Sequence, residues 1–291
     1  MCWPQVAGLF NVKPYARIYL SPHLDDAVLS CGGRIWQQVQ AGERVLVITA
    51  FAGDPSPGIS LSPFARELHV RWGSPVDAVA RRRDEDLTAL AYLGAEVAHW
   101  PYPDCIYRRG PYGRFLYVGE EALWGEVHPA DGKLIEGLTS RLAALPVKQG
   151  GEVYAPLGVG HHVDHQILRR AADALRRIRV GQALTYYEDF PYAEDPQAVQ
   201  AALAGTKAEI GLVMLSEEAL AAKIAAIICY RSQISTFWAG ADHVAARVRA
   251  FARRTGDGEA AIADVDRASG RSCVRASGAE RYWKLTLTSR G

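Results

Sequence analysis

Short apolar runs alternate with longer segments of helical periodicity over the first two thirds of the chain. The short runs are typical of buried strands, and the segments between them carry apolar residues at the spacing of a helix. Strands that alternate with helices indicate a parallel sheet with right-handed crossovers. The pattern therefore predicts an α/β fold, a Rossmann-like and mostly parallel sheet flanked by helices. The expected strands are residues 16–20, 44–51, 96–100, 152–157 and 184–187, and the helices between them are residues 28–41, 76–93, 131–142 and 165–178.

The rest of the chain is predicted to consist of two irregular segments and a mainly helical C-terminal region. Residues 52–75 are rich in Gly and Pro, and residues 101–129 are rich in aromatic residues. The aromatic segment can be a loop packed by its own rings, one wall of a sugar-sized cleft, or both. Since there is no Gly/Ser/Pro linker, we expect one domain over residues 1–291, with a core of about 16–190 and a helical elaboration of about 191–291. The expected late elements are helices at 196–204, 216–230 and 241–254 and a strand or tail at 281–287.

Composition excludes several classes of function. The chain has 291 residues and a formal net charge of +1, which argues against a broad nucleic-acid interface. Its five cysteines are scattered without a C-x-x-C pair, as in a reducing compartment. Neither a signal peptide nor an apolar run of the ~18 residues needed for a membrane helix is present. We therefore expect a cytoplasmic protein that binds no nucleic acid and does not span a membrane, with homo-oligomerisation left open.

Two clusters of polar side chains follow the first and the fourth expected strands. His23, Asp25 and Asp26 lie within four residues of one another, and residues 161–165 read His-His-Val-Asp-His. The carboxyl ends of parallel strands share one edge of a sheet, where ligands bind in open α/β folds. A polar turn with an aspartate capping the next helix explains the first cluster alone about equally well. The second cluster, in a matching position, favours a functional site.

The spacing within the clusters fits a catalytic metal site. His23 and Asp26 are three residues apart, as are His162 and His165, so each pair can share one face of a turn. His23, Asp26 and one downstream histidine make three ligands with an open position, which is the catalytic form of a zinc site. Asp25 then points elsewhere and is free to act as a general base.

These motifs resemble those of a known family. The run Ser21–Gly33, Ser-Pro-His-Leu-Asp-Asp-Ala-Val-Leu-Ser-Cys-Gly-Gly, resembles the N-terminal signature of the LmbE-like/PIG-L family of zinc-dependent de-N-acetylases, commonly His-Pro-Asp-Asp-Glu followed by Gly-Gly. Residues 162–165 resemble the family's His-Pro-Asp-His, and Arg82-x-x-Glu85 resembles the helix between the two motifs. The resemblance is closest over about residues 16–190. Leu24, Val163 and Ala27 replace the usual Pro, Pro and Glu, which leaves the substrate open.

The resemblance implies a role for each matching residue. His23, Asp26 and His165 would bind Zn2+, or another divalent ion, and Asp25 would be the base. His162 would assist the tetrahedral intermediate, oriented by Asp164, and Arg82 would reach the substrate pocket.

Two assignments remain open between neighbouring interpretations. His161 and His165 are four residues apart, so spacing alone does not separate His161 from His162 as the catalytic histidine, and we follow the family register. Asp104 is either a turn residue or a hydroxyl acceptor for a sugar, and it is included among the candidate substrate-binding residues.

The predicted function is a zinc-dependent amidohydrolase that removes an N-acetyl or other N-acyl group from a molecule containing an amino sugar. The alternatives are a metal-dependent hydrolase of another amide or ester, and a Rossmann-like module that binds a nucleotide or other ligand without hydrolysis. The last is disfavoured because the first strand ends in His-Leu-Asp-Asp rather than in G-x-G-x-x-G.

Overall fold

A computed structural model describes residues 13–58, 60–74, 76–263 and 277–286. A seven-stranded sheet runs through the molecule in the order β3-β2-β1-β4-β5-β7-β6. β1 pairs in parallel with both β2 and β4, so the strand order reverses direction at β1, and this is where open α/β sheets bind ligands. The predicted Rossmann-like sheet is confirmed. The strands are β1 (Tyr15–Ser21), β2 (Val45–Thr49), β3 (Glu96–His99), β4 (Val147–Pro156), β5 (Ala183–Tyr187), β6 (Lys207–Leu215) and β7 (Gly278–Thr286).

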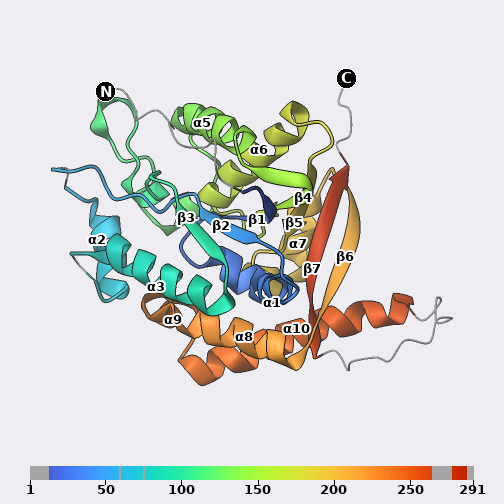
Figure 1. Cartoon of the computed structure of the whole chain (residues 1–291). Helices are drawn as coiled ribbons and strands as arrows, with labels where there is room; N and C mark the ends of the chain where they lie inside the picture. Colours follow the sequence, from blue (N-terminus) through green and yellow to red (C-terminus); the bar gives the residue numbers. More distant parts are fainter. Residues whose placement is uncertain (1–12, 59, 75, 264–276, 287–291) are drawn as a thin grey trace.

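Helices cover both faces of this sheet (Figure 1). One face carries α1 (Asp26–Gln40), α3 (Ala78–Leu93), α8 (Glu217–Ile228) and α10 (Ala241–Ala263), and the other carries α5 (Gly132–Ala143), α6 (Val163–Ile178) and α7 (Pro196–Leu203). Each layer closes over its own apolar core, so the sheet is buried on both sides, as a parallel sheet requires. Three short helices complete the fold, namely α2 (Pro63–Arg71), α4 (Glu120–Leu123) and α9 (Arg231–Phe237).

Gly33 lets α1 pack closely against the C-terminal strands of the sheet. A Cβ atom on Gly33 would lie 2.7 Å from Cδ1 of Leu215, at the end of β6. The backbone N–H of Gly33 also donates a hydrogen bond of 3.0 Å to Glu280 on β7. A side chain at position 33 would therefore push α1 away from the C-terminal strands.

The C-terminal region differs from the expected helical elaboration. It adds β7 antiparallel to β5, and β6 antiparallel to β7, to the same sheet. The strand expected at 281–287 corresponds to β7, whereas β6 was not predicted. β6 lies at the sheet edge and much of it is exposed, so it lacks the continuous apolar pattern of the central strands.

Three short helices were also missed, and one of them, α4, lies within residues 101–129, which were expected to be irregular. α2 lies within the segment expected to be a loop, and it begins with Ser62, whose side chain accepts a hydrogen bond from the Ala65 N–H, followed by Pro63 in the first turn. The many Gly and Pro residues nearby masked this start signal. α9 follows α8 almost directly and lies beyond the end of the helix expected at 216–230. No helix in the described residues is both long and apolar enough to cross a bilayer.

Candidate active site

The candidate residues meet at the carboxyl edge of the sheet, where four strands end. His23 follows β1, Asp104 follows β3, and Asp189 follows β5. After β4 the chain turns through Gly158 and Gly160, both with positive φ, before His162 caps the start of α6. The turn is one that L-residues rarely adopt, and it brings α6 over the edge of the sheet.

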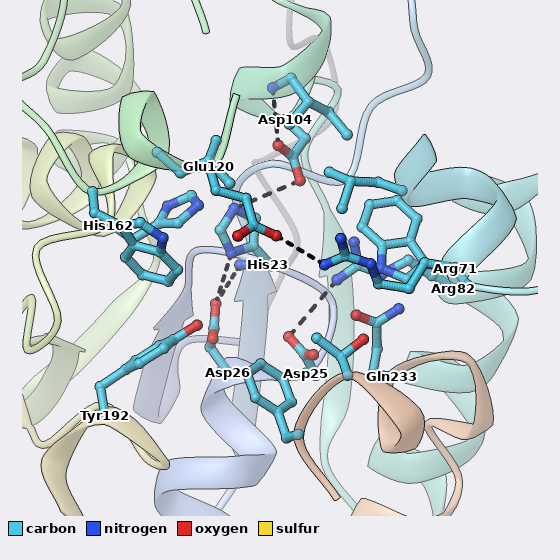
Figure 2. A pocket seen from close by; sticks show the side chains of 17 residues that line it. His23, Asp25, Asp26, Arg71, Arg82, Asp104, Glu120, His162, Tyr192 and Gln233 are labelled. Atoms are coloured by element: carbon cyan, nitrogen blue, oxygen red, sulfur yellow. Dashed lines mark hydrogen bonds and ion pairs between the residues drawn. The ribbon is translucent and has the colours of Figure 1, made fainter. Parts of the chain in front are cut away.

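A cavity of about 280 Å³ opens at this edge (Figure 2). Six of the sequence-predicted site residues line it: His23, Asp25, Asp26, Arg82, Asp104 and His162. Asp164 and His165 are buried behind the lining, at 0% and 1% exposure. Aromatic and apolar side chains form much of the remaining wall, which includes Leu68, Trp72, Ile106, Leu123, Trp124, Tyr192 and Phe237. The structure thus brings all eight predicted residues to one place.

Asp26 lies between two histidine rings at the spacing of metal ligands. Its Oδ2 atom is 3.2 Å from Nδ1 of His23 and 3.3 Å from Nε2 of His165. Two ligand atoms on a tetrahedral zinc ion, each about 2.0–2.1 Å from the metal, lie roughly 3.3 Å apart. The donor set and its spacing therefore fit zinc.

A carboxylate contacts the remaining nitrogen of each of these two histidines. Nε2 of His23 is 3.0 Å from Oδ2 of Asp164, and Nδ1 of His165 is 2.7 Å from Oδ1 of Asp189. Histidines that bind metals usually have such a partner, which fixes the ring and its tautomer. Asp189 was missed from the sequence because the Glu-Asp pair after the fifth strand carries no motif. Its position at the end of a parallel strand was the available signal.

Asp164 has a different partner from the one expected. Its carboxylate contacts His23 rather than orienting the ring of His162, and it also accepts hydrogen bonds from the Cys105 N–H and from Arg108. Arg108 is 6% exposed and forms an ion pair with Asp131 as well. Arg108 opposes the effect of burial on Asp164 and lowers the pKa of this carboxyl below its usual range. Asp164 is therefore held as a fixed anion next to His23.

His162 offers a second way of completing a three-ligand set. His23, His162 and His165 each bring one nitrogen within 4.8 Å of the others. However, Nδ1 of His162 accepts a hydrogen bond of 3.2 Å from the backbone N–H of Asp164. The proton of the neutral ring is then on Nε2, which becomes a donor without a free lone pair. This favours Asp26 over His162 as the third ligand and leaves His162 as a hydrogen-bond donor.

The charges in the cluster follow from burial and from close partners. Burial would raise the pKa of Asp26, but His165 and His23 hold it well below its usual value. Burial would lower the pKa of His165, but Asp26 and Asp189 raise it to about 10. For His162, burial and the two neighbouring histidines together lower the pKa well below its usual value. His162 is therefore neutral, in agreement with its hydrogen bonding.

Asp25 stands apart from the ligand set although it adjoins Asp26 in sequence. It lies 5% exposed in the cavity wall, and its Oδ1 atom is 3.9 Å from Nη2 of Arg82. Burial and the neighbouring Asp26 carboxylate raise the pKa of Asp25 to about 7. A carboxylate with a pKa near neutrality suits a general base.

The structure separates the two adjacent histidines, because His162 lines the cavity and His161 does not. The side chain of His161 is 50% exposed, and its Nδ1 atom lies 2.9 Å from the Gln166 amide, outside this cavity.

Asp104 caps a short turn by accepting a hydrogen bond from the Ile106 N–H, and its other oxygen lies 3.7 Å from Nε2 of His23. Both interpretations of Asp104 are thus compatible with the structure.

Comparison with known proteins identifies the family. The PIG-L family, described as GlcNAc-PI de-N-acetylase, matches residues 18–176, more than half of the chain. The chain belongs to the PIG-L family. The matched PIG-L region contains both His/Asp clusters and Arg82, whereas Asp189 and the C-terminal strands lie beyond it.

Similar PIG-L proteins are named as deacetylases. A 2'-N-acetylparomamine deacetylase from Niallia circulans is 30% identical over 194 residues, which cover 62% of this chain and 69% of that protein. A teicoplanin deacetylase solved in a zinc-inhibited form superposes with a TM-score of 0.78 at 27% identity, covering 94% of this chain and 99% of the other. The A40926 pseudoaglycone deacetylase superposes with a TM-score of 0.67 at 29% identity, covering 94% and 98%. The predicted family and the type of enzyme, an amide hydrolase, are confirmed.

Proposed function

We propose that this protein is a zinc-dependent N-deacetylase acting on a molecule that contains an N-acetylated amino sugar. The observation that carries the proposal is the position of Asp26 at 3.2 and 3.3 Å from nitrogens of His23 and His165, with Asp25 free beside it. His23, Asp26 and His165 would hold the ion. When bound there, zinc supplies a Lewis acid and lowers the pKa of a water molecule.

The remaining residues of the site supply the steps of amide hydrolysis. Asp25 takes the proton from the attacking water, as its position in the cavity wall and its raised pKa suit a general base. His162 donates from Nε2–H to the oxyanion that develops on the acetyl carbonyl. Asp25 or His162 then protonates the departing nitrogen. The products are a free amine and acetate.

Several observations support an amino-sugar substrate. The relatives are named for 2'-N-acetylparomamine, teicoplanin and the A40926 pseudoaglycone. The cavity of about 280 Å³ has the size of a small-molecule site, and Trp72, Trp124 and Tyr192 present aromatic surfaces of the kind that pack against sugar rings. Trp124 is 40% exposed next to His162, at a ring distance of 5.2 Å.

The test is release of acetate and of a free amine by protein loaded with one equivalent of zinc. The substrates are 2'-N-acetylparomamine, an N-acetylglucosamine glycoside, an N-acetylglucosamine-bearing glycopeptide pseudoaglycone, and a simple acetate ester as comparison. We expect turnover of at least one N-acetylated sugar, and loss of turnover when the metal is removed by a chelator and its return on adding zinc. Hydrolysis of the ester alone would contradict the proposal in favour of an esterase.

We also propose that the chain acts in the cytoplasm and forms one domain. Cys31, Cys105 and Cys229 are free thiols, as expected in a reducing compartment. Fractionation of cells that produce the protein tests its location, and limited proteolysis tests the domain. A stable fragment ending near residue 190 would contradict a single domain.

A further inference from the structure

Arg82 is a buried cation whose hydrogen-bonding capacity is unused within the described part of the protein. The residue is 8% exposed, and its guanidinium group lies 4.7 Å from the centre of the Trp72 ring. Its ion-pair contact is to Asp25, at 3.9 Å, which is beyond hydrogen-bonding distance. The Nε atom is buried without a partner among the described residues. Nε is enclosed, but no described residue accepts a hydrogen bond from the Nη groups of Arg82, which lines the cavity, so these donors are available to a ligand there.

Gln233 from α9 adds a buried polar group to the same cavity. It is 5% exposed, and its Nε2 atom donates a hydrogen bond of 3.0 Å to Oγ of Ser232. Figure 2 shows its side chain extending from α9 towards Arg82 and Asp25.

Glu85 determines which way the Gln233 amide faces. The Ser232 hydroxyl donates its proton to Glu85, and the backbone N–H of Ser232 donates to the same carboxylate at 3.0 Å. The Ser232 oxygen can then only accept, so it must face the NH₂ group of Gln233. This leaves Oε1 of Gln233 as an acceptor, and no described residue donates to it. α3 carries both Arg82 and Glu85. It therefore positions the Arg82 guanidinium directly and the Gln233 amide through Glu85 and Ser232.

A donor and an acceptor together favour a hydroxyl group over an anion. A phosphate or carboxylate at this place would accept from Arg82, but it would also face the Asp25 carboxylate and the carbonyl oxygen of Gln233. A hydroxyl group accepts one hydrogen bond and donates another, so it satisfies both residues. Because Arg82 lies 3.9 Å from the candidate base Asp25, this hydroxyl must be close to the reacting amide.

We propose that Arg82 and Gln233 together bind a free hydroxyl group on the carbon next to the one that bears the acetamido group. In a 2-acetamido sugar this is the 3-hydroxyl, because the oxygen at the other neighbouring carbon has no proton in a glycoside. The inference rests on the proposed function and deepens it by defining the substrate class. Gln233 is the specificity-determining residue of the pair, and it lies outside the region that matches the PIG-L family.

The test compares a methyl glycoside of N-acetylglucosamine with its 3-deoxy analogue. For the zinc-loaded wild-type protein we expect kcat/KM to fall about 100-fold or more on the deoxy analogue, because two buried polar groups lose their partner. Gln233→Met keeps the length of the side chain but removes the acceptor. It should lower kcat/KM for the hydroxylated sugar about 10-fold while leaving the deoxy sugar within about twofold.

Matched variants separate recognition from a general effect on the fold. Gln200→Met, at an exposed position on α7, should behave as wild type on both sugars. Zinc content and thermal unfolding are measured for each variant. Equal kcat/KM of the wild type for the two sugars, or an equal loss on both in Gln233→Met, would overturn the inference.

Measuring how tightly the two sugars bind distinguishes a failure of this inference from a failure of the proposed function. The Asp25→Asn protein should bind the hydroxylated sugar about 10-fold or more tightly than the deoxy analogue in calorimetry, without turnover. If the wild type releases no acetate from any N-acetylated sugar, the proposed function is wrong and this inference falls with it. If acetate is released but binding of the two sugars is equal, the inference alone is wrong.

Discussion

Asp189 joins His165, in the candidate metal site, to the loop that precedes His162. Its Oδ1 atom is 2.7 Å from Nδ1 of His165. Its Oδ2 atom accepts hydrogen bonds of 2.8 Å from the backbone N–H groups of Gly158 and Val159. One buried carboxylate at the end of β5 therefore orients the ring of His165, a proposed metal ligand, and also fixes the turn after β4.

Replacing Asp189 should weaken metal binding without removing a ligand. Asp189→Asn cannot accept from His165 and from both backbone N–H groups equally well, so the His165 ring loses its fixed orientation. We expect zinc affinity to fall about 10- to 100-fold, measured by competition with a chromogenic chelator. Asp84→Asn, at an exposed position on α3, is the matched control. Unchanged zinc affinity in Asp189→Asn would mean that its role is confined to the turn.

The proposed ligands make a direct prediction about metal content. The purified protein should bind about one zinc ion per chain, and His23→Ala or Asp26→Ala should lose it, because each removes one of three ligands. His243→Ala, an exposed position on α10, should retain full occupancy. Metal analysis after dialysis against a weak chelator provides the measurement. Full occupancy in both ligand variants would place the ion elsewhere.

Local sequence patterns were sufficient to predict the parallel part of the sheet and the location of the site. Central strands such as β2 are apolar at every position, and a polar cluster directly after such a strand must lie at its carboxyl edge. This is why His23 and His165 could be brought together from positions more than a hundred residues apart. β6 was missed because an exposed edge strand does not carry this pattern.

The partners of the site residues were much harder to predict, because they depend on packing between distant segments. Asp164 was expected to orient His162, its neighbour in sequence, but Arg108 and the Cys105 N–H hold its carboxylate against His23. The irregular segment after β3 supplies both contacts, and nothing in its sequence indicates where it packs. The contacts of Gln233 were equally hard to predict, since the orientation of its amide depends on Glu85 of α3.

Substitutions of Asp25 and of Asp26 should have different effects, although the two residues are neighbours in the sequence. Asp25→Asn removes the proposed general base but leaves the proposed ligand set intact, so zinc should remain bound while kcat falls about 100-fold or more. Circular dichroism and zinc content control for folding. Asp26→Asn, by contrast, should lose metal. Normal turnover in metal-loaded Asp25→Asn would show that another residue is the base.

The last prediction concerns His161 and His162. His162 lines the cavity with its Nε2 proton available, whereas His161 is half-exposed and bonded to Gln166 outside it. His162→Ala should therefore keep zinc and lower kcat about 100-fold, since a donor to the developing oxyanion acts mainly in the transition state.

His161→Ala should retain both zinc and kcat within about twofold, because the contact it loses, to Gln166, lies outside the cavity. His165→Ala, in the same helix start, should lose zinc because it removes a ligand. The measurement is zinc content beside kcat for the three variants. If His161→Ala abolishes turnover while His162→Ala does not, the catalytic histidine is one residue earlier than the family register places it. Loss of zinc in His162→Ala would instead make this residue a ligand, which contradicts the assignment of the Nε2 proton made from its hydrogen bond to the Asp164 backbone.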